Sequence, residues 1–243
     1  MTEAQWNSLC AFREEFKAKI EEWNHRVPNL MELQKQAAEL AKTPPYPFET
    51  PIVYNLALDA LTPNDDIKLL VIGDNPGKDE QLAKNNRYLV GQAGKLGEGF
   101  FRSNPCLHTD FRRNAIILNK TPVHSAKTAQ LKTIIKNGGK SAAELIEESQ
   151  IWMAQKTALL ARSLGAELWL VGYSELKEKG IFVRYRDTLK ECADMKRLFV
   201  FQHFSMNRFS IDLKNFMQER PELTLKDALC ALGSRHRTEI FGM

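Results

Sequence analysis

Four short apolar runs recur along the chain, and polar side chains do not alternate with apolar ones in any of them. Beyond the first one or two positions of each run, every residue is apolar. Strands that are covered on both faces of a parallel sheet have this pattern, whereas half-exposed strands alternate. We therefore predict buried strands over residues 67–72, 114–118, 167–171 and 197–201.

The chain before the first strand predicts two helices and a connection. Thr2 and Gln5 have the spacing of a capping box, and apolar residues follow at spacings of three and four. Pro28 ends this helix, and a second helix is predicted over residues 29–42 with its first residue, an asparagine, as cap. Prolines cluster early in residues 43–66, so this segment should cross the surface as an extended connection.

The segments between and after the strands complete the predicted fold. Apolar positions in residues 141–164 indicate one or two crossover helices. Ser210 can cap a helix that runs to about Gln218, and residues 221–243 are predicted to form a helical appendix with a loose end. Strand, helix and strand in this order predict a doubly wound α/β layer.

Length and composition fit one domain. A chain of 243 residues with 43% hydrophobic side chains can bury a sizeable core. We predict a single domain, with an α/β core over residues 67–220, a helical extension before it and the appendix after it. The formal charge is only +4, and Lys and Arg are spread along the whole chain. The chain therefore has no basic tail of the kind that by itself indicates nucleic-acid binding.

The sequence carries no signal for a membrane or a metal. No apolar run approaches the roughly 20 residues of a membrane span, and the N-terminus lacks the order of a secretion signal. We expect a cytoplasmic protein. The cysteines form no Cys-x-x-Cys pair, so we expect reduced thiols in the core and no metal or other cofactor. They are Cys10, Cys106, Cys192 and Cys230.

Polar side chains follow the first and the fourth predicted strands. Because the carboxyl ends of parallel strands meet at one edge, the Asn75 carboxamide and the His203 imidazole should converge on one cleft. Asn75 can hold a water in one orientation, and Asp74 could instead accept a proton or point away. The alternative is a tight turn in which both bond only local backbone. His124 and Ser125 either line the mouth of this cleft or lie on a surface loop.

Four segments together resemble the uracil-DNA glycosylase superfamily. Residues 73–77, Gly-Asp-Asn-Pro-Gly, resemble the Gly-x-Asn-Pro-Gly motif of its mismatch-specific and single-strand-selective branches. Residues 88–95 are similar to the Pro-Phe-Val-Gly-x-Ala-Gly segment of its thermostable branch. Residues 116–119 resemble the apolar strand that ends in a base-reading Asn, and residues 203–205 resemble the His-Pro-Ser motif. The segments occur in the family's order.

The resemblance implies a three-layer α/β/α fold with strand order 2-1-3-4 and a monofunctional DNA glycosylase that removes uracil or a related deaminated base. By this resemblance Asn75 positions the attacking water, and His203 donates a hydrogen bond to the leaving base. Asn119 pairs with the N–H and C=O of uracil, which excludes cytosine. Taken alone, Asn119 can also be a strand-end cap, and His203 a satisfied histidine at a sheet edge. The other residues placed around the base are Gly73, Pro76, Tyr88 and Leu89.

The implied partner is DNA, either single-stranded or with its damaged base extruded from the duplex. We expect a monomer without membrane contact. Phosphate contacts are predicted for Ser205, Ser174 in the turn of residues 172–174, Lys120, and the helix N-terminus after Phe209. Residues that could wedge into the base stack are Met206, Arg208 and Phe209.

Two residues depart from the family's pattern. Phe204 replaces the proline of the His-Pro-Ser motif, and Leu89 stands where a phenylalanine stacks on the base. That stacking could pass to Tyr88, Phe100 or Phe101. The departures keep open a non-catalytic member of the fold that binds nucleic acid or a nucleotide. The modest net charge keeps open a hydrolase of free nucleosides or other small N-glycosides.

Overall fold

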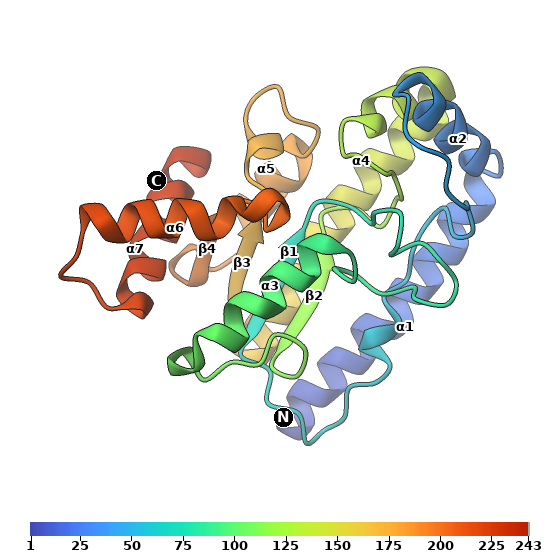
Figure 1. Ribbon diagram of the computed structural model, residues 1–243. Helices are drawn as coiled ribbons and strands as arrows, with labels where there is room; N and C mark the ends of the chain where they lie inside the picture. Colours follow the sequence, from blue (N-terminus) through green and yellow to red (C-terminus); the bar gives the residue numbers. More distant parts are fainter. Residues whose placement is uncertain (243) are drawn as a thin grey trace.

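A central parallel sheet of four strands organises the protein, in the computed structural model that describes residues 1–242. The strand order is β2-β1-β3-β4, and all three pairings are parallel (Figure 1). The predicted α/β fold class and strand order are confirmed. The strands are β1 (Leu69–Gly73), β2 (Ala115–Asn119), β3 (Glu167–Val171) and β4 (Leu198–Phe201).

The strand ends differ from the predicted ones by at most two residues. β3 has the predicted bounds, while β1 and β2 each run one residue further, to Gly73 and Asn119. These two residues are register partners, so the side chain of Asn119 stands beside the backbone of Gly73. The last residues of both strands therefore belong to the edge where the loops begin.

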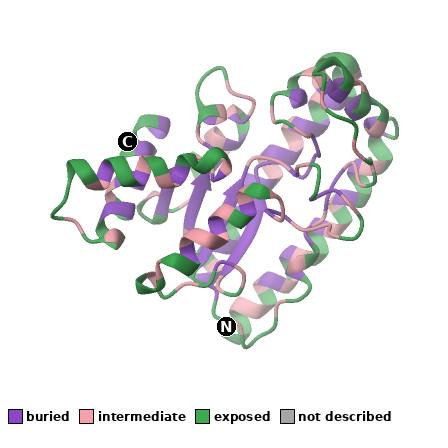
Figure 2. Cartoon of the chain, viewed as in Figure 1, coloured by how far each residue is buried: buried purple, intermediate pink, exposed green. Residues whose placement is uncertain are grey.

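Each face of the sheet buries its own hydrophobic core (Figure 2). Successive residues of a strand point to opposite faces, so Leu70 and Ile72 enter one core while Leu69 and Val71 enter the other. This double coverage explains why polar residues do not alternate in the strands.

Four helices cover the first face: α1 (Glu3–Arg26), α2 (Leu30–Leu40), α4 (Gln130–Leu164) and α5 (Val183–Cys192). The predicted capping box between Thr2 and Gln5 is present. The crossover between β2 and β3 is α4, which begins at Gln130 and has non-helical backbone angles at Gly139. The sequence did not predict α5.

Three helices cover the second face: α3 (Gln92–Ser103), α6 (Arg208–Glu219) and α7 (Leu225–Phe241). The sequence did not predict α3, and its prediction of Ser210 as the cap of α6 is wrong. Met206 and Asn207 both have left-handed backbone angles, so the chain turns there and the helix already begins at Arg208. Single 3₁₀ turns are η1 (Leu56–Leu58), η2 (Pro105–Leu107), η3 (Ser174–Leu176), η4 (Met195–Arg197) and η5 (Ser205–Asn207).

The C-terminal helix α7 is part of the second core and not a loose appendix. It packs along β4, where Gly233 lies against the Cβ of Phe199 and the ring of Phe201. Buried His236 donates from Nδ1 to the carbonyl of Val200, at 3.2 Å. None of the helices within residues 1–242 combines the length and the apolar character that crossing a bilayer requires.

The connection over residues 43–66 is extended but does not stay on the surface. Ile52 and Val53 are buried, and Ile52 forms an antiparallel bridge with Val123. The prediction failed because prolines exclude helices and ladders but say nothing about burial. The segment thus lies against the loop that follows β2.

Gly233 offers a test of the contact between α7 and β4. A Cβ at this position would lie 2.7 Å from the Phe199 Cβ, so Gly233→Ala should lower the free energy of unfolding by about 1–3 kcal/mol. The matched variant is Gly99→Ala in α3, where a Cβ meets nothing within 4 Å and alanine favours the helix by about 0.5–1 kcal/mol. Urea denaturation measures both. A Gly233→Ala protein as stable as the parent would contradict the packing of α7.

Candidate functional site

A cleft of about 520 Å³ opens at the carboxyl edge of the sheet. Its walls come from the loops that follow all four strands, which is where open α/β folds bind ligands. Each loop contributes at least one polar residue that the sequence predicted, among them Asn75 after β1, Asn119 at the end of β2, Ser174 after β3 and His203 after β4.

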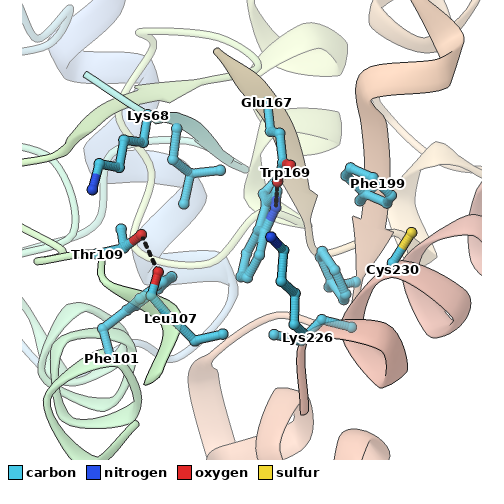
Figure 3. A pocket seen from close by; sticks show the side chains of 12 residues that line it. Lys68, Phe101, Leu107, Thr109, Glu167, Trp169, Phe199, Lys226 and Cys230 are labelled. Carbon is cyan, nitrogen blue, oxygen red and sulfur yellow. Dashed lines mark hydrogen bonds between the residues drawn. The ribbon is translucent and has the colours of Figure 1, made fainter. Parts of the chain in front are cut away.

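A second hollow, of about 280 Å³, lies at the opposite end of the strands, between α3 and α7 (Figure 3). Its floor is aromatic. Several of its polar side chains already have partners: Trp169 Nε1 donates to Glu167 and the Thr109 hydroxyl to the carbonyl of Leu107 (Figure 3), and Lys68 Nζ donates to the carbonyl of His108. Ligand sites need a few convergent polar groups, so the carboxyl-edge cleft is the candidate site.

The ammonium of Lys120 lies beneath the cleft and is 0% exposed. Its Nζ donates to Asp74 Oδ1 at 2.5 Å and to the carbonyls of Val171 and Gly73 at 2.8 and 3.3 Å. Burial lowers the pKa of Lys120, and Asp74 opposes this effect. The predicted phosphate contact of Lys120 is therefore wrong, because this amine binds strand ends inside the protein and does not reach the surface.

The carboxamide of Asn75 is held through its nitrogen. Nδ2 donates to the Ser125 hydroxyl at 2.9 Å, to the Ser125 carbonyl at 3.1 Å and to the Pro76 carbonyl at 3.2 Å. Within residues 1–242, no hydrogen bond reaches its Oδ1. Since Asn75 lines the cleft, an acceptor oxygen remains for a ligand or a water.

The imidazole of His203 is held through Nδ1. The backbone N–H of Ser205 donates to Nδ1 at 3.1 Å, so this nitrogen carries no proton in the neutral ring. The Ser205 hydroxyl lies 2.8 Å from the same atom. Burial lowers the pKa of His203, so the neutral ring with its proton on Nε2 predominates at neutral pH. The cleft then has a neutral N–H donor at this wall.

Asn119 places an unpaired donor in the cleft. The residue is 1% exposed, and its Nδ2 has no hydrogen-bond partner. Its Oδ1 lies where a side chain on Gly73 would be, because a Cβ there would come within 2.6 Å of this oxygen. A buried polar group without a partner costs about 1–3 kcal/mol, so a ligand with an acceptor would recover that free energy. The geometry does not fit a strand-end cap.

Glu80 is a cleft residue that the sequence analysis missed. Its Oε2 accepts a hydrogen bond from the Gly77 N–H at 2.9 Å, and burial raises the pKa of its carboxyl to about 7. The residue lines the cleft together with Asn75 and Leu89, which belong to the same connection between β1 and α3. Its position near the Asn-Pro-Gly motif was a weak signal, because only the folded loop buries it.

His124 and Ser125 are buried, so they do not form a surface loop. Ser125 lines the cleft, while His124 lies behind it. His124 Nδ1 donates to the Pro76 carbonyl at 2.9 Å, and Nε2 accepts from the Tyr46 hydroxyl at 3.0 Å. Burial lowers the pKa of His124 to about 4, so the ring is neutral at neutral pH.

The residues predicted to contact a base divide into two groups. Leu89 lines the cleft. Pro76 is buried behind the cleft residues, and its carbonyl accepts a hydrogen bond from His124 Nδ1. Tyr88 does not reach the cleft: it is 0% exposed, and its hydroxyl donates to the Val53 carbonyl at 2.6 Å. Leu89 has a left-handed backbone, which turns these neighbouring side chains apart. The prediction for Tyr88 is therefore wrong.

Phe204 does not block the cleft. It is 2% exposed and packs in the second core, between the rings of Phe111 and Phe209. Phe100 and Phe101 belong to the same aromatic cluster, where Phe100 contacts Phe209 and Phe101 stacks on Phe111. Neither one lines the cleft, so Leu89 is the one residue of the predicted stacking set that does.

The rim of the cleft carries predicted contact residues of the loops after β3 and β4. Arg208 and Ser174 line the cleft and are exposed, and Met206 is 76% exposed on a left-handed turn. Ser205 uses both its N–H and its hydroxyl toward His203, so its observed contacts orient the imidazole. Phe209 is buried and cannot wedge between bases.

Comparisons with protein-family models, with curated proteins and with solved structures gave no match.

Replacing Lys120 tests the buried ion pair. Lys120→Met leaves the Asp74 carboxylate without its cation, and breaking a buried pair costs about 3–5 kcal/mol of unfolding free energy. The matched variant is Lys214→Met, an exposed lysine outside the ion pairs found within residues 1–242, which should change stability by less than about 0.5 kcal/mol. Chemical denaturation measures both. Equal stabilities of the two variants would refute a structural role for Lys120.

Glu80 predicts a pH dependence of stability. Its folded pKa of about 7 lies above the ordinary value of 4.5, so the folded protein keeps a proton that the unfolded chain loses, and this stability disappears as pH rises from 4.5 to 7. The stability advantage of the parent over Glu80→Gln should therefore fall by up to about 3 kcal/mol across that range.

The parent has to be compared with the variant at each pH, because His124 also changes the free energy of unfolding with pH. Its pKa is lowered from 6.5 to about 4, so its contribution to stability rises with pH between these two values, opposite to that of Glu80. Denaturation at each pH measures the difference. Glu178→Gln, at an exposed glutamate, is the control and should give no trend. A constant difference for Glu80→Gln would mean that its carboxyl is not protonated in the fold.

Proposed function

We propose that this protein is a DNA glycosylase that hydrolyses the N-glycosidic bond of uracil or a related deaminated base, as in base excision repair. One observation carries the proposal. Asn75 Oδ1, Asn119 Nδ2 and His203 Nε2 lack protein partners within residues 1–242, and all three side chains line one cleft. Its volume of about 520 Å³ lies within the usual range for ligand pockets, about 300–1,000 Å³.

The reaction needs charge stabilisation on the leaving base. The electron pair of the bond between the anomeric carbon and the base nitrogen leaves with the base, and the sugar becomes cationic in the transition state. His203 Nε2–H can donate to a carbonyl oxygen of the base as negative charge develops there. A neutral donor suits this role, because it stabilises the transition state without a proton transfer.

The reaction also needs an aligned water. Its oxygen forms the new bond to the anomeric carbon, while its proton passes to solvent and the departing base is protonated from solvent. Asn75 supports this step best, because it lines the cleft, its nitrogen is fixed by Ser125, and its oxygen accepts no hydrogen bond within residues 1–242. Asp74 is the weaker candidate, since Lys120 already occupies its Oδ1.

Asn119 is the residue proposed to select uracil over cytosine. Its Nδ2 is an unpaired donor, and uracil offers a carbonyl next to an N–H, which match the donor and the acceptor of one carboxamide. Cytosine lacks this N–H and would place an unprotonated ring nitrogen there. Rejection of a base that leaves buried groups unpaired can be large.

DNA would approach over the rim. A stacked base has to leave the duplex, or to lie in a single strand, before it can enter. Met206 is the exposed apolar side chain that supports a wedge role, and Arg208 and Ser174 are placed to contact phosphates. The chemistry as written uses only water, and we propose that a monomer carries it out without a cofactor.

A second candidate, a hydrolase of free nucleosides, is favoured by the charge of the rim. Lys78, Lys127 and Arg208 line the cleft together with Asp79 and Glu175, so cations and anions nearly balance. A surface that binds DNA tightly usually carries an excess of positive charge. A free nucleoside needs no such excess.

Base release from oligonucleotides tests the proposal. On single-stranded and duplex DNA with one uracil, hypoxanthine or xanthine, the protein should create alkali-labile sites. Asn75→Ala and His203→Ala should each lower the single-turnover rate by about 100-fold or more, since the first misplaces the water and the second removes a donor.

The matched controls are Asn137→Ala, on α4, and His108→Ala, in the loop after η2, which replace exposed residues outside the cleft and should keep the rate of the parent. Salt-sensitive DNA binding without alkali-labile sites would replace the proposal with a non-catalytic binder. Base release from free nucleosides alone would support the second candidate.

A further inference from the structure

The segment of residues 43–55, which we name the strap, is bound to both loops that shape the cleft. On the loop after β2, the His124 N–H donates to the Pro51 carbonyl, and the Val53 N–H donates to the Pro122 carbonyl, each at 2.9 Å. Buried Gln34 of α2 links the strap to this loop a third time, because its Nε2 donates to the carbonyls of both Pro51 and His124.

The strap is also hydrogen-bonded to the loop after β1. Gln81 is fully buried, and its Oε1 accepts from the backbone N–H groups of Glu49 and Thr50 at 2.7 and 3.2 Å. Its Nε2 donates to the Pro47 carbonyl at 2.7 Å. The strap therefore holds together the backbones that carry Asn75 and Ser125.

One chain of hydrogen bonds leads from the strap to the cleft. The Tyr46 hydroxyl donates to His124 Nε2 at 3.0 Å, which leaves the ring proton on Nδ1. Nδ1–H then donates to the Pro76 carbonyl at 2.9 Å. The same carbonyl accepts from the Ser125 N–H at 3.1 Å and from Asn75 Nδ2 at 3.2 Å. The Pro76 oxygen is thus the point where the strap and the cleft residues meet.

We propose that Tyr46 and His124 are positioning residues, through which the strap sets the orientation of the Asn75 carboxamide. The inference rests on the proposed function for its catalytic consequence but not for its structural part. Without the Tyr46 hydroxyl, the proton of His124 can move to Nε2, and a bare Nδ1 would then face the Pro76 carbonyl. Two acceptors would repel each other, and the loop would shift Asn75 away from its contacts with Ser125.

The first experiment measures Asn75 directly by NMR. Exchange of its side-chain amide protons with solvent should be at least about tenfold faster in His124→Leu than in the parent, because the hydrogen bonds that hold Nδ2 are weakened. His124→Asn should restore slow exchange to within about threefold, since its amide nitrogen can replace Nδ1 as the donor to Pro76. Unchanged exchange in His124→Leu would overturn the proposal.

The second experiment removes only one oxygen atom. Tyr46→Phe keeps the ring contacts with Phe48 and His124, and ¹⁵N spectra should show part of the His124 proton on Nε2, whereas the parent carries it on Nδ1. The matched variant is Tyr54→Phe, in the same strap, whose hydroxyl donates to Asp59 and should leave His124 unchanged. Proton positions that are identical in all three proteins would refute the role of Tyr46.

The catalytic consequence is measured by single-turnover release of uracil. Tyr46→Phe should lower the rate constant by about 3–10-fold and His124→Leu by about 10–100-fold, with DNA affinity unchanged, while His124→Asn restores most of the rate. Normal rates in an active parent would overturn the proposal and keep the proposed function. A parent that releases no base would refute the proposed function, and the NMR results would still decide the role of the strap.

Discussion

The cleft depends on one buried charge. The Lys120 ammonium has lost its water. The Asp74 carboxylate, the backbone carbonyls at the ends of β1 and β3, and the ring of Phe182 compensate for that loss. An uncharged side chain could not bind all of these acceptors, and a shifted strand would leave some of them unpaired. The ion pair therefore keeps the ends of β1, β2 and β3 in one arrangement. It also commits Asp74 Oδ1 to a structural contact, whereas Asn75 Oδ1 accepts no hydrogen bond within residues 1–242.

The polar groups around the cleft serve two purposes. The partnered atoms, such as the Nδ1 atoms of His203 and His124, hold side chains in place. The open ones, Asn75 Oδ1, His203 Nε2 and Asn119 Nδ2, belong to residues whose other contacts or burial already restrict them. Such a site needs little reorganisation when a ligand binds. Enzymes use preorganised groups of this kind to stabilise developing charge.

The sequence predicted the sheet and much of the cleft, because both follow from local patterns. Unbroken apolar runs identify buried strands, and the polar residues after them must lie at one edge. The directions of single side chains do not follow from such patterns. Tyr88 and Leu89 are neighbours, yet a left-handed turn sends only Leu89 to the cleft.

The sequence failed to predict other features for similar reasons. Lys120 is buried because it pairs with Asp74, which lies in the loop after β1. A lysine just beyond a strand otherwise indicates the surface. Helix α3 was missed because its glycines weaken helix propensity, although two of them are buried against neighbouring elements. The part played by the strap depends on contacts across long separations in sequence, and composition shows only its prolines.

The packing of α7 on β4 has a consequence for biosynthesis. β4 is an edge strand, and its second face is covered by a helix that leaves the ribosome after it. Before α7 has been made, Phe199 and Phe201 lack its cover and lie on a strand with an unpaired edge. Exposed apolar side chains and unpaired edges favour association with other nascent chains. Likewise α1 is made before α4, so its apolar side is not covered until α4 is made. A ribosome that stalls before α7 emerges should therefore present an intermediate that chaperones recognise.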